Sequence, residues 1–257
     1  MLRVAFSICG LYLLAVSLIF AQPAQPALPE SWIAHVKTLE QIRNHTPSDA
    51  LFVKKLFHYV HRHILNDFTE EISFNQTIAT GNYNCLTATT TFALLLDHFN
   101  IRHQIVETTY HIFIIAKLQD NEWLIETTDP LHGLIRKDQV ISQRLENYRK
   151  IVPQQNGYTG YLFKKDIFNV TSLTGLRGLD FYNQAVYAFN RKDMKQSVYL
   201  LQQASVYYHS PRIHELADLL WLSIRESELS DVLKFELTKR LAIVRNLSSP
   251  LLASSAP

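Results

Sequence analysis

Cysteine is scarce in this chain, with only Cys9 and Cys85 among 257 residues. Cys9 lies inside an N-terminal apolar run and lacks the small-residue context of a lipoprotein cleavage site. Once that run is set aside, Cys85 stands alone and the chain cannot close an internal disulfide. A lone thiol is either buried as a small hydrophobic group or kept for its reactivity.

Charge is also sparse. Charged residues make up 19% of the chain, the formal net charge is +2, and no basic run is interleaved with aromatic residues. These features argue against nucleic acid as a partner. The 47% hydrophobic content is that of a folded globular protein with a substantial core.

The first 21 residues predict a secretory signal peptide. Met1-Leu2-Arg3 gives a short positive start, residues 4–21 are apolar, and Ala21 or Ala24 is the expected last residue removed. We therefore expect a secreted or periplasmic protein that has no membrane contact after cleavage. The alternative is an uncleaved helix that anchors the chain, since the apolar run approaches the length of a short spanning helix. Residues 22–30 are rich in Pro, Ala and Gln and read as a linker.

Residues 31–152 predict an α+β domain in which N-terminal helices and a cysteine-bearing helix pack on a small antiparallel sheet. Residues 66–84 have no steady period and read as a long surface loop. The expected helices span 31–45, 49–65, 84–100 and part of 135–151, and the expected strands span 103–108, 111–117 and 122–127.

The second half predicts an all-α helical-hairpin domain over residues 173–246, reached through a connection at 153–172. The expected helices are 173–190, 193–209, 211–226 and 230–245, and residues 247–257 read as a disordered tail. Part of this half resembles one tetratricopeptide hairpin, with Asp193-Met194, Ser197, Leu201, Ala204 and Pro211 near the positions of that motif. A generic helical bundle fits the pattern equally well. If the segment is repeat-like, it implies a concave surface for a peptide or protein partner.

Cys85 falls at the first turn of an apolar helix, directly after the loop segment Gly81-Asn82-Tyr83-Asn84. The positive end of a helix macrodipole favours the thiolate, which is the nucleophilic form of cysteine. Nucleophilic catalysis also needs a base, and a third group that orients that base.

His111 is the candidate base, because it leads directly into the apolar strand Ile112–Ala116 and is partly sheltered there. His58, His61 and His63 form no metal signature with nearby Cys or acidic residues. We expect neither a metal nor a cofactor.

Three segments in order resemble the signatures of the transglutaminase-like superfamily, whose fold is shared with papain-like cysteine enzymes. They are Gly81-Asn82-Tyr83-Asn84-Cys85, Tyr110-His111-Ile112-Phe113 and Trp123-Leu124-Ile125-Glu126-Thr127-Thr128-Asp129-Pro130. The resemblance covers roughly residues 50–135. It implies that Cys85 is the nucleophile and His111 the base.

The third catalytic member is either Glu126 or Asp129. Glu126-Thr127-Thr128 resembles the family's Asp-x-Thr pattern with Glu in place of Asp, and Asp129 opens an Asp-Pro-x-x-Gly pattern. If Leu118 pairs with Trp123, Glu126 shares the face of His111; if Leu118 pairs with Glu122, His111 lies opposite Asp129. Glu126 is preferred because it lies within the strand.

Several donors could stabilise an oxyanion. The Cys85 backbone N–H lies at a helix start, and Asn84 and Gln76 are side-chain candidates from the preceding loop, beside Asn75 and Asn82.

The sequence thus predicts a cysteine-dependent acyl-transfer enzyme that acts on peptide or glutamine-type amides, and more as a hydrolase or peptidase than as a crosslinker. The alternative is an inactive transglutaminase-like scaffold that binds protein partners in the cell envelope.

Overall fold

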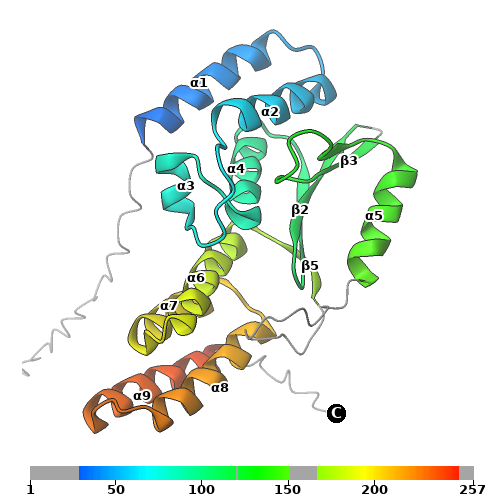
Figure 1. Cartoon of the computed structure of the whole chain (residues 1–257). Coiled ribbons are helices and arrows are strands. Elements are labelled where there is room, and N and C mark those ends of the chain that lie inside the picture. Colours follow the sequence, from blue (N-terminus) through cyan, green and yellow to red (C-terminus); the bar gives the residue numbers. More distant parts are fainter. Residues whose placement is uncertain (1–28, 120, 151–166, 249–257) are drawn as a thin grey trace, which may run out of the picture.

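The computed structural model describes residues 29–119, 121–150 and 167–248 (Figure 1). The predicted signal peptide, nearly all of the predicted linker and most of the predicted tail lie outside these residues. The described chain is α+β, with one small antiparallel sheet and a helical C-terminal region. Its elements are α1 Glu30–Asn44, α2 Asp49–His63, α3 Phe74–Thr80, α4 Cys85–His98, β1 His103–Thr108, β2 Ile112–Leu118, β3 Asn121–Ile125, β4 Leu134–Ile135, α5 Asp138–Lys150, β5 Phe168–Thr171, α6 Leu173–Asn190, α7 Met194–Tyr207, α8 Pro211–Glu226 and α9 Asp231–Ser248.

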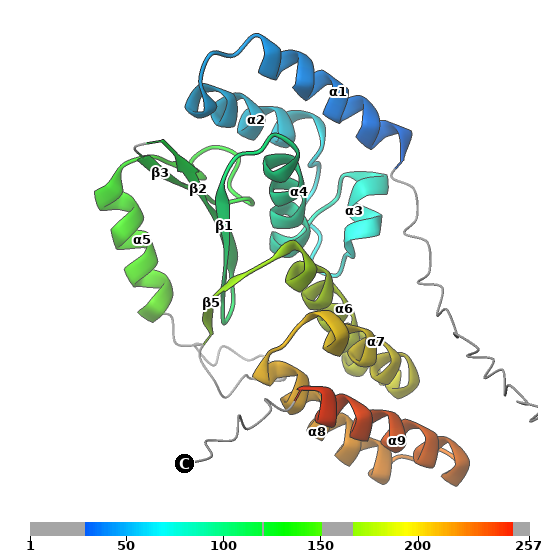
Figure 2. The ribbon, with the colours of Figure 1, turned by 180° about the vertical axis from the view of Figure 1, so that it is seen from behind.

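The sheet has the strand order β4-β3-β2-β1-β5, and each neighbouring pair is antiparallel. The cysteine-bearing helix α4 lies against one face, with α1, α2 and α3 around it, and α5 covers the other face (Figures 1 and 2). No described helix is both long enough and apolar enough to cross a membrane.

Strand β2 is buried on both faces because it is central in the sheet. Ile112 and Ile114 belong to the core shared with α4, whereas Phe113 and Ile115 belong to the core under α5. This alternation follows from the two-residue period of a strand, and it explains why the segment is apolar at nearly every position.

Helix α4 and strand β1 have matching lengths. The 14 residues of α4 span about 21 Å at the rise of an α-helix. The six residues of β1 span about 20 Å at the rise of a strand. Because β1 runs back along α4, the turn between β1 and β2 lies at the same end of the molecule as the start of α4 (Figure 1).

The helical C-terminal region shares the main core with the α4 side of the sheet. Leu176, Leu179 and Tyr182 of α6 belong to the same cluster of buried side chains as Leu86 of α4. Gly178 allows α6 to approach the end of α7 closely, since a Cβ at this position would lie 2.5 Å from the Cβ of Tyr208. The helices 173–190 and 211–226 have the expected bounds.

A buried ion pair also joins the sheet to the helical region. The Arg212 guanidinium on α8 donates to Glu107 on β1 at 3.0 Å, and the exposed fractions of the two side chains are 7% and 4%. Arg212 also donates to the carbonyl oxygens of Thr108 and Thr109, and the Tyr208 hydroxyl donates to Glu107. Burial raises the pKa of Glu107, although the charge of Arg212 opposes this effect.

Three elements were not predicted from the sequence: α3, the two-residue strand β4 and β5. Helix α3 falls within the predicted loop 66–84, where Ser73 and Gln76 form a capping box and Gly81 ends the helix at φ 79°. Strand β5 falls within the predicted connection 153–172 and pairs with the outer edge of β1. This strand has only four residues, and it depends on pairing with a strand that is distant in the sequence. A local sequence pattern cannot reveal such pairing.

Candidate active site

Cys85 is the first residue of α4, as the sequence predicted. Asn84 caps the helix: its side-chain oxygen accepts from the Thr87 N–H at 2.9 Å, and the Thr87 hydroxyl accepts from the Asn84 N–H at 3.0 Å. This capping box fixes the helix start, and Cys85 remains partly exposed there. The backbone N–H of a first helical residue has no acceptor within its own helix.

The Asn84 side chain has no donor left for an oxyanion. Its amide nitrogen donates to the carbonyl oxygens of Glu70 at 3.0 Å and Ile72 at 3.2 Å, and the whole residue is buried. Asn84 therefore joins the preceding loop to the start of α4. Gln76 instead caps α3, where its side-chain oxygen accepts from the N–H and the hydroxyl of Ser73, both at 2.9 Å.

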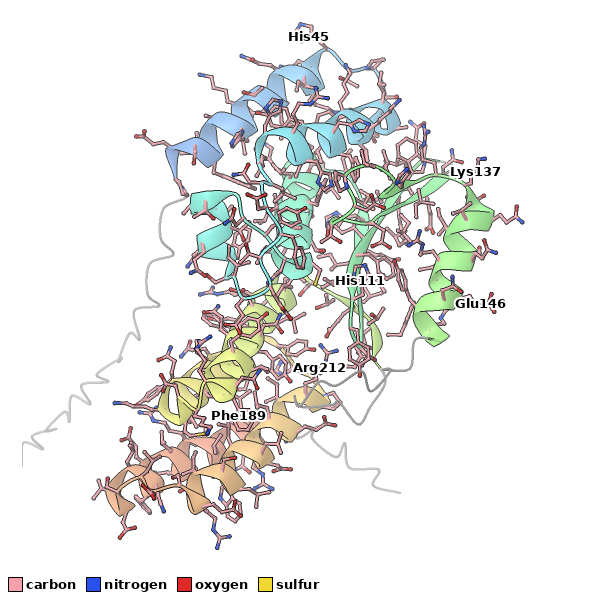
Figure 3. The ribbon with its side chains drawn as sticks, in the orientation of Figure 1. His45, His111, Lys137, Glu146, Phe189 and Arg212 are labelled. Carbon is pink, nitrogen blue, oxygen red and sulfur yellow. The ribbon has the colours of Figure 1, made fainter. Side chains whose placement is uncertain are left out.

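His111 lies one residue before β2, at the sheet end next to the start of α4 (Figure 3). Its backbone N–H donates to the Thr108 hydroxyl at 2.9 Å, and its carbonyl oxygen accepts from the Thr108 N–H at 2.7 Å. These two bonds close the turn between β1 and β2. The imidazole is hydrogen bonded to Glu126 through Nε2, and the neighbouring Cys85 side chain raises its pKa.

Glu126 holds the far side of the imidazole. The distance from His111 Nε2 to Glu126 Oε2 is 2.6 Å, and the Glu126 side chain is only 6% exposed. Because Nε2 is engaged by Glu126, Nδ1 is the ring nitrogen left for the sulfur. The Tyr148 hydroxyl on α5 donates to the second Glu126 oxygen, and the Tyr148 ring stacks on Phe113. Both oxygens of the buried carboxylate are therefore paired.

The strand register explains why Glu126 meets His111. Leu118 pairs with Asn121 and Ile114 with Ile125, so neither of the registers considered from the sequence occurs. The same register continued by one pair puts Glu126 opposite Phe113. Glu126 is then a diagonal neighbour of His111, two residues along the same face. The hairpin is tighter than expected because Gln119 adopts φ 36°, as a two-residue turn requires.

Asp129 lies in the turn after β3, away from the imidazole. Its carboxylate accepts from the N–H groups of Leu131 at 3.1 Å and His132 at 2.9 Å, and its side chain is 44% exposed. The structure thus brings together Cys85, His111 and Glu126, while Asp129 shapes the turn.

The pKa of His111 is raised to about 9. Burial alone would lower this pKa, but the hydrogen bonds to Cys85 and Glu126 and the negative charges of both groups outweigh it. His111 is therefore an imidazolium at neutral pH, with the Glu126 carboxylate as its hydrogen-bonded partner.

Two threonines connect the acid to the nucleophile. The Thr127 hydroxyl lies 2.9 Å from the Thr89 hydroxyl and donates to the Cys85 carbonyl oxygen at 3.5 Å. Both threonines are fully buried. These bonds fix the end of β3 to the first turn of α4, so the acid and the thiol keep a constant separation.

Helix α6 holds the loop that precedes the cysteine. The Tyr187 hydroxyl donates to the Glu70 carbonyl oxygen at 2.9 Å, and Arg191 forms an ion pair with Glu71 at 2.6 Å. Asp180, on the same face of α6, accepts from the Phe74 N–H at 3.5 Å, and burial raises its pKa to about 6. The helical region therefore supports the site directly.

Sequence reasoning missed Tyr148 and the role of Tyr187. Both tyrosines lie on amphipathic helices far along the chain, and no local pattern links them to Cys85. Among the residues that support the site, Thr127 could have been found from the sequence, because it directly follows the predicted site residue Glu126. No group of three or more His, Cys, Asp or Glu residues in the described chain is arranged to hold a metal ion.

The comparisons with known proteins give no match: no family model, no curated protein and no solved structure corresponds to this chain. The chemistry of the site therefore rests on its own geometry. A thiol at a helix start, an imidazolium whose pKa that thiol raises, and a buried carboxylate hydrogen bonded to the imidazolium are the three groups that nucleophilic attack on a carbonyl carbon needs.

Proposed function

We propose that this chain is a cysteine-dependent acyl-transfer enzyme of the transglutaminase-like type that hydrolyses peptide or glutamine-type amides. One observation carries the proposal: Glu126 holds the His111 Nε2 at 2.6 Å, and Cys85 acts on the same imidazole, whose pKa it raises. In this arrangement Cys85 is the nucleophile, His111 the acid and base, and Glu126 the group that orients the imidazole.

The first half of the reaction forms a thioester. The Cys85 thiolate attacks the amide carbonyl carbon, and the carbonyl electron pair moves onto oxygen. The imidazolium then gives its Nδ1 proton to the amide nitrogen, the C–N bond breaks, and the amine leaves. Glu126 keeps the ring oriented throughout and stabilises its positive charge.

The second half releases the acid. Neutral His111 takes a proton from water, the resulting hydroxide attacks the thioester carbon, and the carboxylic product leaves as the C–S bond breaks. The thiolate and imidazolium are then restored. Water is the acceptor we favour, because transfer to an amine needs a site that excludes water.

The oxyanion requires at least one donor beside the sulfur. The backbone N–H of Cys85 fits this role, since it lies at the start of α4 where the helix dipole favours negative charge. The Asn84 side-chain N–H groups already donate to two backbone carbonyl oxygens, and Gln76 belongs to the cap of α3 rather than to that of α4. We therefore assign the oxyanion to backbone N–H donation.

The test is alkylation of Cys85 by iodoacetamide, followed by mass spectrometry on the full chain. In the wild type we expect rapid alkylation at about pH 6, because the imidazolium stabilises the thiolate. His111→Ala should slow this reaction by at least about tenfold. His132→Ala is the matched control, since His132 is 84% exposed.

A second arm tests turnover. Wild type and Cys85→Ser are incubated with a glutamine-containing peptide mixture, with and without a primary amine, and the products are weighed by mass spectrometry. Mass changes that require Cys85 support the proposed enzymatic activity. Mass changes that require both Cys85 and the added amine indicate acyl transfer to that amine. If the alkylation rate of the His111→Ala variant equals that of the wild type and no peptide changes, the chain is an inactive scaffold.

A further inference from the structure

A second site lies between α1 and α2, and His45, which lines it, lies well apart from His111 (Figure 3). It is an open groove of about 670 Å³. Helix α2 contributes Lys55, His58, Arg62 and His63 to its wall, and His45 lies at the end of α1. No acidic side chain lines it.

The positive charge in this groove is not neutralised within the described chain. The Lys55 ammonium donates to the Thr46 hydroxyl at 3.2 Å, and neither Lys55 nor Arg62 forms an ion pair with any described residue. The nearby carboxylates are turned to other partners: Asp49 pairs with Arg43, and Glu40 pairs with His98.

The basic side chains occupy one stripe of α2. Lys55, His58 and Arg62 are spaced three and four residues apart and therefore share a helix face, separate from the face that places Phe52 and Leu56 in the core. An anion bound at this stripe would contact the ammonium and the guanidinium together, and the imidazole between them would offer it a further hydrogen bond.

The groove also offers an apolar surface. Ile42 of α1 and the ring of Tyr59 line it, and the Tyr59 ring lies 4.6 Å from that of His63. The Tyr59 hydroxyl is fixed by His35 at 3.1 Å. A ligand that combines a multiply charged anionic group with an apolar body matches this lining.

We propose that the groove between α1 and α2 binds a phosphate-bearing ligand. An arginine fork and a lysine point charge on one wall suit the several oxygens of a phosphate group, and imidazole N–H groups add further donors. A phosphorylated small molecule and a lipid headgroup both present this chemistry, and the test below separates them. The proposal is independent of the acyl-transfer activity.

The test uses the full chain and two probes, inorganic pyrophosphate in calorimetry and vesicles of phosphatidylcholine with or without phosphatidylglycerol in flotation. The variant is Lys55→Glu with Arg62→Glu. We expect it to weaken binding by at least about tenfold, because two charge-assisted contacts are lost. Binding of pyrophosphate alone assigns a soluble ligand, and binding of the anionic vesicles alone assigns a headgroup.

The matched control is Lys37→Glu with Lys54→Glu. It makes the same change in net charge on the same two helices, but both lysines are exposed and lie outside the groove. It should keep its affinity within about threefold. Equal losses in the two double variants, or no binding of either probe to the wild type, would overturn the proposal. If the glutamate variant fails to fold, Lys55→Gln with Arg62→Gln removes the same cations without adding charge.

Discussion

Tyr187 and Asn84 donate hydrogen bonds to the same acceptor, the carbonyl oxygen of Glu70, at 2.9 Å and 3.0 Å. One donor comes from the helical region and the other from the cap directly before the candidate nucleophile. The shared carbonyl therefore couples α6 to the position of Cys85.

Replacing Tyr187 by phenylalanine should reduce the reactivity of Cys85 without unfolding the chain. The ring stays in place, but the loop at Glu70 loses one of its two donors. We expect the Cys85 alkylation rate to fall by roughly threefold to tenfold, as for the loss of a hydrogen bond of about 1 kcal/mol. The control is Tyr199→Phe, which also removes a hydroxyl that bonds a glutamate, Glu236, far from the cysteine. Equal rates in the two variants would show that α6 does not position the nucleophile.

Glu126→Gln should lower the reactivity of Cys85, because an amide cannot stabilise the His111 imidazolium. Loss of an orienting carboxylate costs catalysis about 10²-fold to 10⁴-fold in comparable triads. Asp129→Asn is the matched control, and we expect it to change the alkylation and turnover rates by less than about threefold. If Asp129→Asn were the more damaging change, the carboxylate assignment would be wrong.

The His111 pKa gives a pH prediction. In NMR the His111 ring should titrate near pH 9, above the ordinary 6.5, and the midpoint should fall in Glu126→Gln. Since the folded pKa is raised, the stabilisation is fully present below about pH 6.5 and is lost as the pH rises towards 9. It amounts to at most about 3 kcal/mol of unfolding free energy. Urea unfolding of the wild type and of His111→Gln, at about pH 6.5 and about pH 9, measures this contribution to the unfolding free energy. Parallel pH curves for the two proteins would contradict the pairing.

The ion pair of Glu107 and Arg212 should be strongly coupled to stability. Glu107→Ala removes the buried carboxylate that accepts from the Arg212 guanidinium, which costs about 3–5 kcal/mol. Asp218→Ala, which breaks the exposed pair with Arg245, should cost no more than about 1 kcal/mol. Urea unfolding measures both. Similar midpoints for the two variants would mean that the buried pair contributes little.

Much of the fold follows from local patterns in the sequence. The caps at Ser48 and Asn84 and the proline at position 211 predict helix starts that the structure places within one residue. The apolar run from Ile112 predicts a central strand. In contrast, β5 and the ion pair of Glu107 with Arg212 depend on contacts about 60 to 100 positions apart along the chain, which no local pattern records.

The candidate site was predictable in its residues but not in its geometry. Cys85 and His111 were indicated by their positions at a helix start and a strand start. The choice between Glu126 and Asp129 depended on the hairpin register, which a local pattern does not reveal and in which Leu118 pairs with Asn121. Tyr148 and Tyr187 entered only through tertiary packing.

The matched lengths of α4 and β1 bear on how this protein can be altered. Both elements start and finish at the same two levels, so the chemistry lies at one end and the connection Phe99–Arg102 lies at the other. Residues inserted in that connection would leave the sulfur and the imidazole at the same level. One extra helical turn within α4 would move the thiol about 5 Å from the ring, further than a hydrogen bond reaches. Peptide tags or flexible linkers therefore belong at the far end of the sheet.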